Sequence, residues 1–132
     1  MRSKILVADD EHEVVTTIAD ILKENNYDVV TAFDGTQVVQ MAHKEKPDLI
    51  IMDIIMPAGA GIGAYENLKK SSKTAIIPVI FITCDPYEET RNKVTKMGAK
   101  GFIYKPFTGE MLLAEIEKVF KGSAMSKGTT IG

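Results

Sequence analysis

The sequence predicts an α/β protein, with a doubly wound, five-stranded parallel sheet and five helices packed on its faces. Five short apolar, β-branched runs recur along the chain, and helix-like segments with short connections separate them. At least three of these runs are too continuously apolar to expose one face to water. Strands buried on both faces belong to parallel sheets covered by helices. Strict alternation of strand and helix also implies right-handed crossovers.

The composition excludes several classes of protein. The chain has 132 residues, 45% of them hydrophobic and 26% charged, and its formal net charge is -2. These values are typical of one globular domain and not of a disordered chain. Charges of both signs are scattered along the sequence, which argues against a dedicated nucleic-acid surface. A single cysteine, Cys84, excludes a disulfide scaffold and indicates a reducing compartment.

We expect a cytoplasmic protein without a membrane anchor. The first residues are basic, but acidic residues soon interrupt the apolar stretch after them, so no targeting peptide is predicted. No uncharged apolar run approaches the ~18 residues that a membrane span requires.

Apolar periodicity and helix-capping residues predict the individual elements. The expected strands span residues 4–8, 28–32, 49–52, 77–83 and 101–104. Helical stripes of apolar side chains comprise Val14, Val15, Ile18, Ile21 and Leu22; Val38, Val39 and Ala42; and Leu112, Ile116, Val119 and Phe120. Asp34 and Gln37 have the spacing of a capping box at a helix start. Asp85 and Glu88 have the same capping-box spacing, with Pro86 at the first helical position.

Two segments are predicted to be weakly anchored. The helix expected over residues 86–97 has only Val94 and Met97 as clear apolar anchors, so it should be among the less stable parts of the domain. Residues 122–132 lack apolar periodicity and are predicted to form a flexible tail or a linker stub. The folded domain is therefore assigned to residues 1–121.

Polar residues follow four of the predicted strands where ligands bind in open α/β sheets. Asp9, Asp10, Asp53, Thr83 and Lys105 all stand at carboxyl ends of strands. Gathering three carboxylates is costly because like charges oppose each other's ionisation, and a hard divalent cation such as Mg²⁺ relieves that cost. With Mg²⁺ bound to the carboxylates, the positive charge of Lys105 needs a further anion to pair with, and a phosphoryl group supplies one.

Four motifs in this order and spacing resemble the receiver domain of bacterial two-component response regulators. They are ILVADD at 5–10, DIIMP at 53–57 with Gly61 after it, FIT at 81–83 and YKPF at 104–107. The resemblance extends over residues 3–121 and implies a flavodoxin-like fold. It also implies a phosphorylation-activated signalling switch rather than a turnover enzyme.

The resemblance implies a role for each residue of the site. Asp53 would be the phosphoacceptor, a nucleophile that takes the phosphoryl group from a histidine kinase or phosphotransfer protein. Asp10 would bind Mg²⁺ directly and Asp9 through water, and the backbone carbonyl of Ile55 would complete the protein ligands. Lys105 would pair with the phosphoryl oxygens, ahead of a cis peptide bond to Pro106.

The resemblance also implies a switch. Thr83 would turn its hydroxyl toward the phosphoryl group, and Phe102 would swing inward behind it. We expect Tyr104 to point to the other face of its strand and assign it no switch role. The output face would comprise residues 86–97 and 101–104. It would control a downstream protein or an output domain outside this sequence, without direct nucleic-acid or membrane binding, and a phosphorylation-dependent dimer stays open.

Two other functions remain alternatives. The first is a small Mg²⁺-dependent phosphatase with Asp53 as nucleophile, although Ile55 stands where a general acid would be needed and no substrate cap is present. The second is a receiver-like interaction module that is never phosphorylated, which the complete set of three aspartates, threonine and lysine disfavours.

Two further features are given structural interpretations. Cys84 is interpreted as a small buried side chain rather than a reactive thiol. Lys69, Lys70 and Lys73 are interpreted as a short solvated face that is too small to bind nucleic acid on its own.

Overall fold

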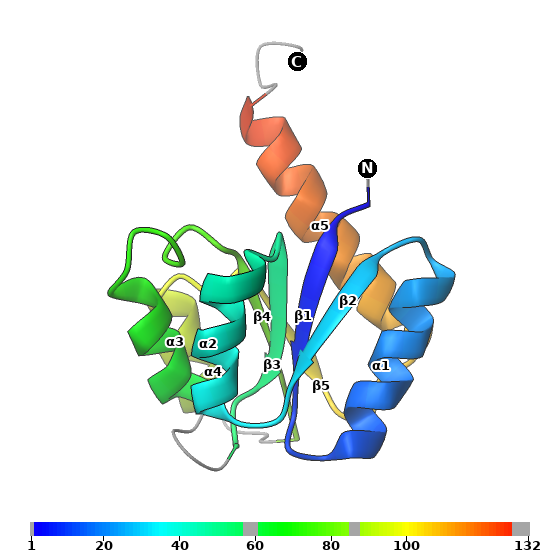
Figure 1. The fold of residues 1–132 in the computed structure, drawn as a ribbon, viewed down its shortest axis with the longest axis horizontal. Coiled ribbons are helices and arrows are strands. Elements are labelled where there is room, and N and C mark those ends of the chain that lie inside the picture. Colours follow the sequence, from blue (N-terminus) through cyan, green and yellow to red (C-terminus); the bar gives the residue numbers. More distant parts are fainter. Residues whose placement is uncertain (1, 57–60, 85–87, 128–132) are drawn as a thin grey trace.

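The computed structural model describes residues 2–56, 61–84 and 88–127, with side chains described as far as residue 122. Strands and helices alternate along the chain (Figure 1). The strands are β1 (Lys4–Ala8), β2 (Asp28–Ala32), β3 (Leu49–Asp53), β4 (Val79–Thr83) and β5 (Gly101–Tyr104). The helices are α1 (His12–Glu24), α2 (Gly35–Glu45), α3 (Gly61–Lys69), α4 (Glu88–Lys96) and α5 (Gly109–Lys127).

The five strands form one parallel sheet in the order β2-β1-β3-β4-β5. Helices α1 and α5 cover one face of the sheet, and α2, α3 and α4 cover the other. The predicted doubly wound, five-stranded α/β fold with five helices is therefore confirmed.

Side-chain alternation along the strands divides the core into two layers. In β1, Ile5 and Val7 face α1 and α5, whereas Leu6 and Ala8 face the opposite helices. Every residue of β3 and β4 is buried, as is all of β1 after its first residue. Continuous apolar sequence in these three strands thus reflects burial on both faces, as predicted.

Asp34 caps the start of α2 as predicted, whereas Gln37 bonds one residue farther back than in a standard capping box. Asp34 Oδ1 accepts a hydrogen bond of 2.8 Å from the Gln37 N–H. Gln37 Oε1 in turn accepts one of 2.9 Å from the N–H of Phe33, one residue before the cap. The first bond satisfies a backbone donor that the helix start leaves unpaired, and the second holds the chain that enters the helix. The start predicted around Asp85 and Pro86 lies outside the described residues, and α4 is described from Glu88.

The predicted start of the fourth strand is wrong, and α5 extends into the segment predicted to be a tail. Strand β4 begins at Val79 rather than at residue 77, because the Ile77 N–H closes a turn by donating to the Thr74 carbonyl at 3.1 Å. Helix α5 continues to Lys127, beyond the tail boundary expected after residue 121. A glycine inside a helix costs only about 1 kcal/mol, and without a proline the segment GSAMSK can propagate the helix one hydrogen bond at a time.

Helix α4 is held by few apolar contacts, as predicted. Val94 is its one buried residue, and Met97, just after the helix, is partly buried against the same core layer. The rest of α4 is polar and faces solvent to a large extent. Within the described part of the chain, no helix is both long and apolar enough to cross a membrane.

Gly61 allows α3 to approach the end of β3 closely. Its N–H donates to the Ile54 carbonyl at 2.7 Å. A Cβ at this position would clash with the backbone carbonyl oxygen of Asp53 and lie 2.8 Å from the Ile54 Cα. Because the opposing atoms are backbone atoms, they cannot rotate away, so α3 and the Asp53 backbone are fixed together.

The substitution Gly61→Ala is expected to lower the free energy of unfolding by about 1–3 kcal/mol, because the backbone at Asp53 must move to admit the methyl group. The matched control is Gly63→Ala in the same helix, where a Cβ meets nothing within 4 Å. That variant should be neutral or up to about 1 kcal/mol more stable, since alanine is the better helix former. Urea denaturation measures both, and equal stabilities would contradict this account.

Candidate functional site

The carboxyl edge of the sheet brings the predicted polar residues together. Asp9 directly follows β1, and Asp53 is the last residue of the adjacent strand β3. Strand order reverses between these two strands, which is where doubly wound sheets bind ligands. Lys105 follows β5, at the end of the sheet beyond β4.

The Lys105 ammonium joins the two buried carboxylates. Its Nζ donates to Asp9 Oδ2 and to Asp53 Oδ2, each at 2.8 Å, and lies 3.5 Å from Glu11 Oε1. Asp9 is fully buried and Asp53 is 6% exposed. The predicted proximity of Asp9, Asp53 and Lys105 is confirmed. One cation therefore compensates two carboxylates that have little contact with water.

Backbone amides fix the other oxygen of each carboxylate. The Glu11 N–H donates to Asp9 Oδ1 at 2.9 Å, and the Ile55 N–H donates to Asp53 Oδ1 at 3.0 Å. Each carboxylate thus has one oxygen on a backbone donor and the other on Lys105. This arrangement fixes the orientation of Asp53 before any ligand arrives.

The charge of Lys105 is strongly favoured by its surroundings. Burial on its own lowers the pKa of the ammonium. The hydrogen bonds and negative charges of Asp53 and Asp9 outweigh that effect and raise the pKa above the ordinary value of 10.5. Lys105 is therefore protonated throughout the physiological range.

Asp10 completes an acidic cluster that fits a hard divalent cation. One carboxylate oxygen from each of Asp9, Asp10 and Asp53 lies within 4.8 Å of the others. Asp10 is exposed, so this oxygen set opens to solvent. Carboxylate oxygens with access to water are the ligands that Mg²⁺ prefers, and a single lysine leaves the cluster with an excess of negative charge. The donor chemistry of the site therefore suits Mg²⁺.

Thr83 lies at the end of β4, next to the strand that leads to Lys105. It is fully buried, and its backbone carbonyl accepts a 2.9 Å hydrogen bond from the Lys105 N–H. In the parallel register, Thr83 pairs with Tyr104 and Phe81 pairs with Phe102. The backbone of Thr83 is thus directly connected to the segment that carries the ammonium.

The expectation that Tyr104 lies on the opposite face from Phe102 is wrong. The two rings are in contact, with centroids 5.1 Å apart. Side chains two residues apart in a strand project from the same face, so alternation places them together. Arg91 of α4 lies over the Phe102 ring, with its guanidinium carbon 5.8 Å from the ring centroid. Both aromatic residues therefore belong to the α4/β5 surface, and Arg91 connects Phe102 to α4.

A hollow of about 470 Å³ opens beside the ammonium, between α1 and the segment that follows β5. Val14, Thr17, Cys84, Lys105 and Phe107 contribute to its wall.

The interpretation of Cys84 as a buried side chain is wrong: the thiol is exposed, because the chain leaves the sheet directly after Thr83. The Lys105–Pro106 peptide bond is cis, as the resemblance implied.

Two residues near the site were not predicted. Glu11 lies near Lys105, and its place in the acidic run that begins at Asp9 was an available signal. The contact between Arg91 and Phe102 had no such signal, because nothing in the sequence around a surface arginine identifies its partner on another element.

Replacing Lys105 with methionine is expected to lower the free energy of unfolding by about 3 kcal/mol at pH 7, because buried Asp9 and Asp53 lose their cation. The pKa of Lys105 is raised in the folded protein. Its charge therefore stabilises the fold fully below pH 10.5, and this stabilisation is lost only when the pH rises above the pKa of Lys105 in the folded state. The difference between the wild type and the variant should therefore be constant from about pH 7 to 10.

Urea denaturation at each pH measures this difference. Adding Asp53→Asn to the Lys105→Met variant should recover part of the lost stability, because one uncompensated carboxylate is removed. A double variant less stable than Lys105→Met alone would contradict the assigned pairing.

Comparison with known proteins agrees with this geometry. The family model described as the response regulator receiver domain matches residues 5–117. The chain is 35% identical over 121 residues to the phosphate regulon transcriptional regulatory protein PhoB of Escherichia coli, covering 92% of this chain and 53% of PhoB. It is 32% identical over 126 residues to the alkaline phosphatase synthesis transcriptional regulatory protein PhoP of Bacillus subtilis, and the match covers 96% of this chain and 52% of PhoP.

Other matches extend over nearly whole proteins. Protein PilH of Pseudomonas aeruginosa is 33% identical over 120 residues, which cover 91% of this chain and 99% of PilH. The solved structure of chemotaxis response regulator CheY4 of Vibrio cholerae superposes with a TM-score of 0.85 at 28% identity, covering 90% and 99%. The chain thus spans about half the length of PhoB and PhoP but nearly all of PilH and CheY4. With the fold and the carboxylate–lysine site in place, the chain belongs to the response regulator receiver domain family.

Proposed function

We propose that the chain is a signalling switch that accepts a phosphoryl group on Asp53. The observation that carries this proposal is the Lys105 ammonium, 2.8 Å from both Asp53 and Asp9 at the end of the sheet. A fixed cation beside a fixed carboxylate suits the transfer of a dianionic group, because both the nucleophile and the compensating charge are positioned in advance.

The chain's own residues account for the transfer step. An oxygen of the Asp53 carboxylate attacks the phosphorus of a phosphohistidine donor, a P–O bond forms, and the P–N bond breaks. The leaving imidazole nitrogen takes up a proton. The Ile55 N–H holds one Asp53 oxygen, which orients the carboxylate for attack. Lys105 then pairs with oxygens of the transferred group and compensates its charge.

Asp10 and Asp53, Asp9 through water, and the backbone carbonyl of Ile55 would hold Mg²⁺. The close approach of the three carboxylates supports this assignment. When bound, the ion supplies the additional positive charge that three phosphoryl oxygens require. The exposure of Asp10 gives the metal and the donor a common route from solvent.

Phosphorylation of Asp53 would change the structure of β4, β5 and α4. The acyl phosphate adds nearly two negative charges, and the Thr83 hydroxyl would turn toward it. Thr83 carries the backbone hydrogen bond to Lys105, and β5 beside it carries Phe102. Helix α4 has one buried anchor, so a small change in free energy can move it. Phe102 would move inward as its contact with Arg91 changes.

Receiver domains are signalling switches rather than conventional enzymes, and the partners of this chain are assigned accordingly. The donor would be a sensor histidine kinase or a phosphotransfer protein. Residues 1–121 would form the receiver, and the output would be a separate protein or a further domain. PhoB and PhoP are transcriptional regulators by name, and this chain matches about half of each. Nucleic-acid contact by this chain itself is not part of the proposal.

Acetyl phosphate with Mg²⁺ should add one phosphoryl group to the wild type and none to Asp53→Ala, because Asp53 is the nucleophile. Intact-mass spectrometry and peptide mapping measure this outcome. Asp10→Ala should react much more slowly, whereas Asp20→Ala, which removes an exposed acid elsewhere on α1, should react like the wild type. Labelling that persists in Asp53→Ala would contradict the proposal, and multiple turnover on a phosphomonoester would favour the phosphatase alternative.

Beryllofluoride with Mg²⁺, a mimic of the phosphoryl group, should change amide exchange in α4 and β5 more than in α1. The expected change follows from the single buried anchor of α4. Hydrogen–deuterium exchange measures it, and Thr83→Ala should bind the mimic with little change in α4 and β5. Equal protection of these elements with and without the mimic would contradict the assigned output face.

A further inference from the structure

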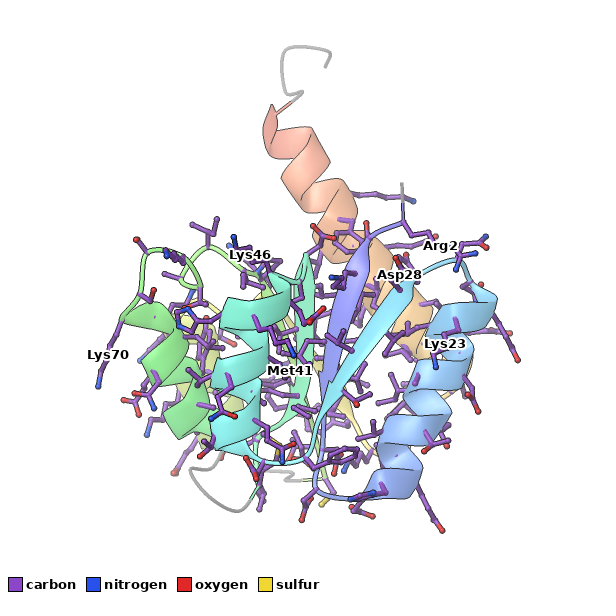
Figure 2. The ribbon with its side chains drawn as sticks, viewed as in Figure 1. Arg2, Lys23, Asp28, Met41, Lys46 and Lys70 are labelled. Atoms are coloured by element: carbon purple, nitrogen blue, oxygen red, sulfur yellow. The ribbon has the colours of Figure 1, made fainter. Side chains whose placement is uncertain are left out.

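A second hollow lies at the amino edge of the sheet, opposite the phosphoacceptor site. It has a volume of about 420 Å³ and is formed by the end of α2, the segment before β3 and the segment before β4. Lys46 lies at the upper end of α2 in Figure 2, on this edge of the molecule. The proposed transfer and switch steps use none of the residues that line this hollow.

The hollow presents an apolar side chain from an ordered turn. Ile76 lines it and is 82% exposed, whereas Ile77 beside it is 7% exposed. The turn is held by the buried Thr74 hydroxyl, which donates to the Leu68 carbonyl at 2.6 Å. The Ala75 N–H also donates to the Ser71 carbonyl at 2.8 Å. The Ile76 side chain therefore adds little to the packing of this chain and is available for contact with a partner at the hollow.

Positive charge surrounds this apolar surface. Lys46 and Lys73 line the hollow, and Lys69 donates to the carbonyl of Ala75, next to Ile76, at 3.0 Å. Burial, and then the positive charge of nearby Lys100, lower the pKa of Lys69. None of these four lysines takes part in an ion pair among the described residues.

The other ionisable groups of the hollow offset this charge only in part, because one carboxylate faces two lysines. Asp48 lines it, and its Oδ2 already accepts a 2.7 Å hydrogen bond from the Lys4 backbone N–H. His43, on the last turn of α2, adds an imidazole ring as a hydrogen-bonding group beside the lysine ammoniums. Lys4 itself lies 3.2 Å from Glu45 and is thus compensated separately.

We propose that this hollow, bounded by Lys46, Lys73, Ile76 and Ile77, is a docking site for an acidic segment of a partner protein. An apolar side chain of that segment would enter the hollow against Ile76 and Ile77, and flanking carboxylates would pair with Lys46 and Lys73. Charge complementarity with an apolar anchor favours a peptide over nucleic acid, which has no aliphatic side chain to fill the hollow. The concave shape of the hollow disfavours a flat membrane surface.

The two edges of the sheet would then serve different partners at the same time. The phosphoryl donor reaches the carboxyl edge, and the acidic segment binds the amino edge, so neither excludes the other. Binding at the hollow should therefore be independent of Asp53. This separates the present inference from the proposed phosphorylation, because either can fail alone.

The test is a titration of the full chain with a labelled peptide that has a central Leu-Phe pair between runs of Glu and Asp. NMR chemical shifts locate the bound peptide, and fluorescence anisotropy measures its affinity. We expect saturable shifts at Ile76, Ile77 and Lys73, and affinity that falls as salt increases. Ile76→Ser and Lys73→Glu should each weaken binding at least 5-fold. Both side chains are exposed, so the variants should fold, and thermal melting checks this.

The matched controls alter exposed residues away from the hollow. Lys23→Glu on α1 and Met111→Ser on α5 should bind like the wild type, as should Asp53→Ala. The inference is overturned if the peptide gives no saturable shifts at the hollow, or if a peptide with Lys in place of Glu and Asp binds equally well. It is also overturned if phosphatidylglycerol vesicles or a DNA duplex bind with higher affinity and lose it in the same two variants.

Discussion

The ammonium of Lys105 is the group on which the arrangement of the site depends. It lies 2.8 Å from a carboxylate oxygen of Asp9 and 2.8 Å from one of Asp53, and both carboxylates are buried. Without that cation, two like charges held away from water would oppose folding. The three residues come from the ends of β1, β3 and β5. The same contact therefore compensates the charge of the site and connects three strands at one edge of the sheet.

The distribution of anchoring around this site explains how a local change in charge could act at a distance. Strands β3 and β4 are buried along their whole length, so the backbone that carries Asp53 and Thr83 is rigid. Helix α4, by contrast, has Val94 as its one buried residue. In the proposed mechanism a phosphoryl group competes for Lys105 and Thr83, and the least firmly held neighbour responds. Rigid strands thus keep the chemistry in place while α4 provides the movement.

The parallel architecture also separates charge between the two edges of the sheet. Every crossover helix runs antiparallel to the strands, so helix starts lie at the carboxyl edge and helix ends at the amino edge. Acidic residues occupy the first turns of α1, α4 and α5, and basic residues occupy the last turns of α2, α3 and α4, as helix dipoles favour. The acidic cluster at the carboxyl edge and the lysines of the proposed hollow at the amino edge follow the same distribution of charged side chains.

The sequence by itself determined which runs of residues form strands, which faces of the helices are apolar, and which polar residues reach the carboxyl edge of the sheet. These features depend on near neighbours, and periodicity and capping residues record them locally. Only the tertiary structure decided which acids Lys105 contacts, that Arg91 lies on Phe102, and that Cys84 is exposed. Such contacts join elements far apart in the chain, and their geometry follows from how helices pack on a twisted sheet, which no local pattern encodes.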